Sequence, residues 1–174
     1  MIVGTTVQNS LKMTRFYRQL YQSPLGPLSV VVDEESLVGI WFCDQANCEQ
    51  GLEHIEEAFQ PLHGAVFEWL DRYFIGESPS MPFPLSPQGT DFQQRVWAYL
   101  AQIPYGESRT YGEIARALSC RSAQAIGQAV GRNPLVLLIP CHRVLGTEKK
   151  LTGYAAGLDR KRWLLQHEAI SWKE

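Results

Sequence analysis

The chain has 174 residues, of which 45% are hydrophobic and 20% charged. This composition is typical of a globular protein with one or two small domains, and it excludes a disordered or fibrous chain. No stretch approaches the roughly 20 consecutive apolar residues of a membrane helix. The first ten residues also lack the basic flank and the apolar run of a signal peptide, so we expect a cytosolic protein without a membrane partner.

The net charge of −2 is the sum of two unequal halves. Residues 1–90 carry four Lys/Arg and eleven Asp/Glu, a net charge of −7, whereas residues 91–174 carry twelve and seven, a net charge of +5. A near-neutral total argues against a nucleic-acid partner only when the charge is evenly spread. The basic half is therefore a candidate for contact with phosphate groups.

The first ninety residues predict a small α/β domain. Strand-like runs over residues 14–42 are separated by turn residues and predict an antiparallel sheet. Helical spacing of apolar residues then predicts two helices, over residues 52–59 and 62–74. Residues 77–89 contain four prolines and cannot propagate a helix. We therefore expect an N-terminal scaffold domain over residues 1–76 and a linker over 77–89.

Residues 90–174 predict a second, mainly helical domain. Capping-box sequences begin helices at Thr90 and at Thr110, and Ser122 can cap a third helix. The last two of these helices, joined by a tight turn in the basic half, match a helix-turn-helix. The third helix is mostly Ala and Gly, which suits close approach to a minor groove or a phosphate backbone. Helix pairs of this kind also occur in proteins that never bind DNA.

The densest reactive chemistry follows the continuous apolar run 135–139, where Cys141, His142 and Arg143 stand in succession. A free thiol has a pKa of about 8.5, so thiolate at neutral pH requires a neighbouring base or a cationic field. Adjacent side chains of an extended segment point to opposite sides. The pattern therefore predicts a turn at Cys141 and a proton relay to His142 through a water molecule.

A histidine base needs a third group that fixes its tautomer and stabilises the imidazolium. The predicted C-terminal helix ends at Gln166-His167-Glu168, and Glu168 is the better candidate because a carboxylate both orients and compensates. The plain alternative is a buried thiol, a core histidine bonded to backbone, and a surface carboxylate. The remaining cysteines are expected to be small buried hydrophobes, and the absence of any C-x-x-C pair argues against a metal site.

Several segments together resemble the O6-alkylguanine-DNA alkyltransferase family, and the similarity is continuous from about Phe92 to Glu168. The motifs that carry it are Pro140–Val144, Gly131–Pro134, Gly153–Gly157, Arg160–Glu168 and the helix that begins at Tyr111. The N-terminal half is similar only in length, element order and acidic character. The resemblance implies a ribonuclease-H-like N-terminal domain and a C-terminal helix-turn-helix that binds the minor groove of double-stranded DNA.

The resemblance also implies the activity, which is irreversible, single-turnover transfer of an alkyl group to a cysteine without a cofactor. The expected substrates are O6-alkylguanine and, less readily, O4-alkylthymine, in bases flipped out of the duplex. By position, Cys141 becomes the alkyl acceptor, with His142 as its base through water and Glu168 behind it. Asn133 would brace the turn before the reactive segment. Tyr111 would protonate the leaving guanine.

The same resemblance implies contacts with the substrate and with DNA. The carbonyl groups of Val144 and Cys141 would accept from the exocyclic amine of guanine, while Tyr154 and the Ala155 amide would line the pocket near the reacting oxygen. The implied DNA contacts are Ser122, Ala123, Gln124, Ala125, Gly127 and Arg132.

One position departs from the family pattern. Where the family commonly has an arginine that wedges into the base stack, this chain has Gln124. Glutamine is shorter and neutral, so weaker base flipping is expected unless Arg121 or Arg132 substitutes. Relatives with tryptophan at the reactive position bind lesions without repairing them, and Cys141 places this chain with the reactive members.

Two other functions fit some of these residues. A helix-turn-helix regulator could use Cys141 as a redox or alkylation sensor. A cysteine hydrolase could use Cys141 and His142, although the small domain offers no evident oxyanion site. We expect a monomer, with cooperative assembly on DNA left open.

Overall fold

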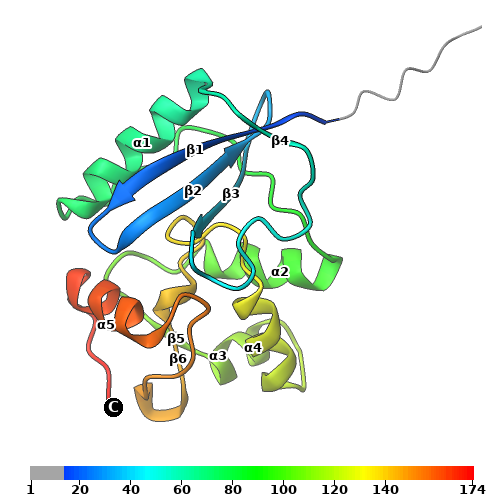
Figure 1. The fold of residues 1–174 in the computed structure, drawn as a ribbon. Helices are drawn as coiled ribbons and strands as arrows, with labels where there is room; N and C mark the ends of the chain where they lie inside the picture. The colour runs from blue at the N-terminus through cyan, green and yellow to red at the C-terminus, as the bar shows by residue number, and fades with distance from the viewer. Residues whose placement is uncertain (1–13) are drawn as a thin grey trace, which may run out of the picture.

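The computed structural model describes residues 14–174 (Figure 1), so the first ten residues, in which no signal peptide is expected, lie outside it. A four-stranded sheet with one helix comes first and a mainly helical part follows. The elements are β1 Phe16–Ser23, β2 Gly26–Val32, β3 Leu37–Phe42, β4 Ile55–Glu57, α1 Pro61–Phe74, α2 Asp91–Leu100, β5 Arg109–Thr110, α3 Tyr111–Ala117, α4 Ala123–Gly131, the 3-10 helix η1 Cys141–Arg143, β6 Val144–Leu145, the 3-10 helix η2 Thr147–Lys149, and α5 Leu158–His167.

The four-stranded sheet has the order β3-β2-β1-β4. Its first three strands form the predicted antiparallel meander, with a two-residue turn at 24–25 between β1 and β2, closed by Gly26 at a positive φ of +109°. Helix α1 lies along the sheet, where Phe67 packs on Tyr21 with ring centroids 5.2 Å apart. The fourth strand, β4, pairs parallel with β1, so the sheet is mixed rather than purely antiparallel.

The predicted helix over residues 52–59 is wrong. The chain turns before this segment and then forms β4, and positive φ angles at Gly51 (+84°) and His54 (+57°) interrupt any helical run. Without β4, strand β1 would be left with an unpaired edge, and Arg18 on β1 binds the carboxylates of Glu49 and Glu57. Pairing with a distant strand therefore outweighs a local spacing of apolar residues that resembles a helix.

The predicted helix starts in the second half are confirmed. The Thr90 side chain accepts from the Gln93 amide at the start of α2, and Thr110 and Glu113 form the same reciprocal capping box at the start of α3. The Ser122 hydroxyl accepts from the third residue of α4 at 3.1 Å. Helices α3 and α4 form the expected helix pair. None of the helices in the described part of the chain combines the length and apolar character needed to traverse a bilayer.

The outer edge of the sheet, strand β3, is paired with two later segments. Residues 84–86 of the proline-rich segment exchange hydrogen bonds with Leu37 at 3.0 and 2.8 Å. Residues 134–136 exchange hydrogen bonds with Ile40 at 2.8 and 3.2 Å. The start of the buried apolar run is therefore attached to the N-terminal sheet, and one hydrophobic core extends through both halves.

Candidate active site

The reactive segment is held by Asn133, which is buried. The Asn133 side chain donates to the Ile139 carbonyl at 2.7 Å and accepts from the Leu135 amide at 2.9 Å. These two bonds close residues 135–139 into a compact loop. The chain then enters η1 at Cys141, which confirms the predicted turn.

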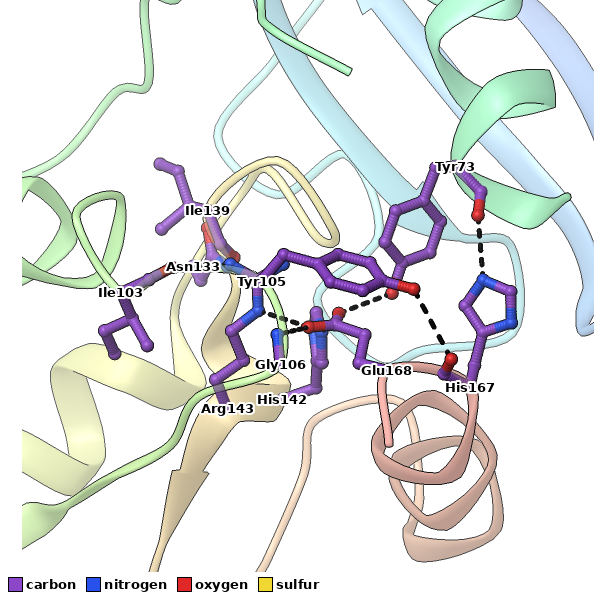
Figure 2. A network of polar contacts seen from close by, with 10 residues as sticks. All are labelled: Tyr73, Ile103, Tyr105, Gly106, Asn133, Ile139, His142, Arg143, His167 and Glu168. Carbon is purple, nitrogen blue, oxygen red and sulfur yellow. Dashed lines mark hydrogen bonds and ion pairs between the residues drawn. The ribbon is translucent and has the colours of Figure 1, made fainter. Parts of the chain in front are cut away.

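Glu168, at the end of α5, is the centre of a buried hydrogen-bond network (Figure 2). Its Oε2 atom accepts from His142 Nε2 at 2.5 Å and from the Tyr73 hydroxyl at 2.7 Å. Its Oε1 atom accepts from Arg143 Nε at 2.7 Å and from the Gly106 amide at 3.2 Å. Three segments of the chain, distant from one another in sequence, therefore converge on one carboxylate.

The network fixes the charge of each partner. Burial alone would raise the pKa of Glu168, but the hydrogen bonds from His142 and Arg143 and the positive charge of Arg143 outweigh it, so its pKa is lowered and it is ionised. Burial lowers the pKa of His142, and Glu168 offsets this only in part. The imidazole is therefore neutral at neutral pH. Its Nε2–H donates to the carboxylate, which leaves the lone pair on Nδ1.

His142 Nδ1 is buried and has no hydrogen-bond partner among residues 14–174. Cys141 is 4% exposed, and no direct hydrogen bond joins its sulfur to His142. Burial raises the pKa of Cys141, although the Asn133 side chain and the charge of Lys161 oppose that rise. At rest the cysteine is therefore a thiol whose deprotonation requires a base.

Lys161 on α5 is a second buried cation near the cysteine. Its ammonium group donates to the carbonyl groups of Thr152 and Gly153 at 3.2 and 3.3 Å. Burial lowers its pKa to about 8, while the nearby Cys141 favours the charged form. The charge of Lys161 therefore stabilises a thiolate at Cys141.

Cys141 opens into a cavity of about 150 Å³ between α3, α4 and the loop before α5. The residues that line it are Tyr111, Gly127, Val130, Gly131, Cys141, Gly153, Tyr154 and Ala155. The Tyr111 hydroxyl accepts from Thr152 Oγ1 at 3.4 Å, which leaves its own proton free to donate. The Tyr154 hydroxyl is buried without a partner in the described chain.

The structure brings together most of the sequence-predicted site residues. Tyr111, Cys141, Tyr154, Ala155 and Gly127 share the cavity, whereas Val144 is fully buried and does not line it. The Val144 amide instead donates to the Cys141 carbonyl.

The remaining predicted DNA contacts lie on or beside α4. Ser122, Ala123 and Gln124 are exposed at its start, and Ala125 is half-buried. Arg132 is exposed just beyond its end and lines a larger cleft of about 690 Å³ with residues of α2 and α4. Small side chains thus dominate the exposed start of α4.

Sequence reasoning gave no role in the Glu168 network to Tyr73, Gly106 or Arg143, and it also missed Lys161 beside the cysteine. Tyr73 is 95 positions from Glu168 and Gly106 is 62 positions away, and no periodic pattern connects such distances. Lys161 did leave a signal, because positions 161, 164, 165 and 168 share one buried helix face.

Comparisons with known proteins show which family this chain resembles. The family model "6-O-methylguanine DNA methyltransferase, DNA binding domain" matches residues 91–170, and the "ribonuclease-like domain" model of the same family matches residues 16–87. The methylated-DNA–protein-cysteine methyltransferase of Methanosarcina acetivorans is 42% identical over 158 residues, which cover 87% of this chain and 97% of that protein. That of Mycobacterium tuberculosis is 43% identical, covering 87% and 91%.

A solved structure of the same family is also similar to this chain. The crystal structure of Mycobacterium tuberculosis OGT in complex with DNA superposes with a TM-score of 0.80 at 41% identity, covering 87% of this chain and 92% of that one. The two family models together span most of the chain, and the mixed sheet followed by a helical part is the architecture of these relatives. The chain therefore belongs to the 6-O-methylguanine DNA methyltransferase family.

Proposed function

We propose that this protein repairs alkylated DNA by transferring the alkyl group of O6-alkylguanine to Cys141, once per molecule. O4-alkylthymine is proposed as a poorer substrate. The observation that carries the proposal is the position of the Cys141 thiol in the wall of a cavity, directly before a histidine that a buried carboxylate orients. Such an arrangement supplies a thiolate on demand inside a water-poor pocket.

The proton path starts at the thiol. The Cys141 proton passes through a water molecule to His142 Nδ1, and Glu168 stabilises the resulting imidazolium. The sulfur then attacks the alkyl carbon, and an S–C bond forms as the C–O6 bond breaks with its electron pair going to the base. Tyr111 donates a proton to the base as it leaves, and the proton taken up by His142 then restores the Tyr111 hydroxyl. Overall, the thiol proton replaces the alkyl group on guanine, and the thioether is not regenerated.

The remaining residues bind and place the substrate. Asn133 holds the loop that presents Cys141, as its two hydrogen bonds support. Tyr154 and the Ala155 amide contact the region of the reacting oxygen, and the carbonyl group of Cys141 accepts from the exocyclic amine.

DNA binding is assigned to the exposed start of α4 and to Arg132 just beyond its end. The small side chains of Ser122, Ala123 and Ala125 permit close approach to a minor groove, while Gln124 and Arg132 supply polar contacts. A base inside the duplex stack cannot enter the cavity, so the lesion is flipped out of the stack.

We further propose a cytosolic monomer that needs no cofactor or metal. Residues 1–76 act as an acidic scaffold, and residues 90–174 carry the DNA-binding and acceptor groups beyond the connection at 77–89. The separate family-model ranges 16–87 and 91–170 support a division into two domains.

The test is stoichiometric labelling. The protein is mixed with a duplex that contains one O6-methylguanine, and intact and peptide masses are measured. We expect one methyl group on the Cys141 peptide, none in Cys141→Ser, and normal labelling in the control Cys120→Ser. A metal chelator should leave the rate unchanged. Multiple turnovers, or an unmodified Cys141 peptide, would contradict the proposal.

The pH dependence gives a second measurement. Burial lowers the pKa of His142, so its free base persists below the ordinary histidine value of about 6.5. The base is lost only when the imidazole takes up a proton at lower pH. The transfer rate should therefore hold through pH 6.5 and fall only in more acidic solution.

A further inference from the structure

The N-terminal half contributes one side chain to the Glu168 network, and that side chain is Tyr73 on α1 (Figure 2). We propose that Tyr73 is a positioning residue for alkyl transfer, whose hydroxyl fixes the Glu168 carboxylate in the orientation that holds His142. The inference rests on the proposed roles of His142 and Glu168. It assigns to the scaffold domain a direct part in arranging the proton relay.

The Tyr73 hydroxyl and the His142 imidazole donate hydrogen bonds to the same oxygen atom of Glu168. Glu168 Oε2 accepts from the Tyr73 hydroxyl at 2.7 Å and from His142 Nε2 at 2.5 Å, and all three side chains are buried. A carboxylate oxygen has two lone pairs, and both are used here. Rotation of the carboxylate would therefore break the bond to His142 and the bond to Tyr73 together.

The Tyr73 ring is itself fixed on several sides. It stacks on Trp69 with centroids 5.5 Å apart and planes 5° apart, and it meets the rings of Phe74 and Tyr105 edge-on. The Tyr73 carbonyl contacts His167 Nε2 at 2.8 Å. Helix α1 is thus joined to the end of α5 at two points, and the aim of the hydroxyl is set by packing.

Tyr73 stays a donor throughout the working pH range. Burial raises its pKa, and the adjacent negative charge of Glu168 raises it further. Its hydrogen bond draws off part of the negative charge of Glu168 that would otherwise favour the imidazolium. The charged groups that act on His142 are Glu168, which favours the imidazolium, and Arg143 and Lys161, which oppose it.

Tyr73→Phe removes the hydroxyl and keeps every ring contact. Glu168 Oε2 is then less firmly held, which lowers the transfer rate at the pH optimum. The negative charge of Glu168 also acts more strongly on His142 once the Tyr73 hydrogen bond is lost. The pKa of His142 therefore rises, and the acid limb of the rate profile moves to higher pH. A tyrosine that only filled space between the domains would change neither quantity on replacement by phenylalanine.

The experiment measures single-turnover methyl transfer to Cys141 between pH 5 and 9. We expect Tyr73→Phe to lower the plateau rate by about tenfold, which is the effect of losing one hydrogen bond to a charged group. We also expect the acid limb of the rate profile to move to higher pH. Tyr21→Phe is the matched control. The Tyr21 hydroxyl donates to the Asp71 carboxylate at 2.5 Å and takes no part in the Glu168 network. This variant should leave the rate and the limb unchanged.

A double-mutant cycle tests whether Tyr73 acts through Glu168. In a Glu168→Gln background, Tyr73→Phe should change the remaining rate less than twofold. An unchanged rate and limb in Tyr73→Phe, or an undiminished tenfold loss in the Glu168→Gln background, would overturn the proposal.

A third measurement does not depend on activity. Titration of the His142 ring by NMR in unreacted protein should give a higher pKa in Tyr73→Phe than in the wild type, and an equal pKa would count against Tyr73. If the wild type failed to methylate Cys141, the proposed function would fall while this titration still tested the link between Tyr73 and His142.

Discussion

The Glu168 network and the exposed start of α4 differ in how their geometry is determined. Glu168 accepts four hydrogen bonds from Tyr73, Gly106, His142 and Arg143, which come from distant parts of the chain. The start of α4 is set by one local bond, from Ser122 to the helix backbone, and presents mostly small side chains. The first region depends on the whole fold and the second on nine residues of sequence.

The two regions should therefore differ in how well they tolerate substitutions. A buried polar network is strong only when every member is satisfied, so loss of one donor affects all the others. An exposed helix face has water as an alternative partner, so single changes there have smaller and separable effects. Substitutions in the Glu168 network should therefore be poorly tolerated, while the DNA-contacting face can be changed one position at a time.

The largest expected effect is that of Arg143→Met. This change leaves the buried Glu168 charge without its cation, and breaking a buried pair in this way costs about 3–5 kcal/mol of unfolding free energy. Urea unfolding at pH 7 measures it. Arg72→Met is the control, because the Arg72–Glu77 pair is about half-exposed and should contribute at most about 1 kcal/mol.

The destabilisation caused by Arg143→Met should depend on pH. The pKa of Glu168 is lowered in the fold, so its contribution is present above its unfolded pKa of about 4.3 and is lost as the pH falls through the folded value. The gap between wild type and Arg143→Met should narrow as the solution becomes more acidic than about pH 4. A gap that widened there would contradict the ion-pair explanation.

A smaller effect is expected for Ser122→Ala, which removes the cap of α4. The unfolding free energy should fall by about 1 kcal/mol, because one amide at the helix start loses its acceptor. Ser122→Asn retains a capping oxygen and should lose much less. If the two variants were equally destabilised, the cap would not be what determines the start of α4.

The smallest effect is expected for Gln124→Arg. An added cation at the exposed start of α4 should raise the repair rate in duplex DNA by a few fold and steepen its salt dependence by about one phosphate contact. The rate with free O6-methylguanine should stay unchanged. Gln128→Arg adds the same charge one helical turn later, and an equal gain there would show a general charge effect rather than a role at position 124.

Local signals predicted much of this molecule. The three helix caps at Thr90, Thr110 and Ser122 depend on residues three positions apart, and each is found in the structure. The family motifs around Cys141 and Glu168 identified the two ends of the His142 relay. Such features are visible because their partners are close in sequence or lie within one continuous motif.

Long-range pairing accounts for what the sequence could not show. Strand β4 forms by pairing with the edge of β1 that β2 leaves free, and the spacing of Leu52, Ile55 and Phe59 carries no information about that pairing. Tyr73 was correctly placed on a helix, but its partner Glu168 is 95 positions away. Hydrogen bonds between distant side chains have no periodicity, so only the folded chain reveals them.

The pairing of residues 134–136 with strand β3 has a consequence for how the protein is made. During synthesis the sheet leaves the ribosome first and exposes its β3 edge, which is a site for aggregation until it is covered. The segment that covers its Ile40 end leads directly into Cys141, and it emerges about ninety residues later. Protection of this part of the sheet edge and placement of the loop that presents Cys141 thus depend on the same backbone pairing, so the edge stays open until that loop has been made.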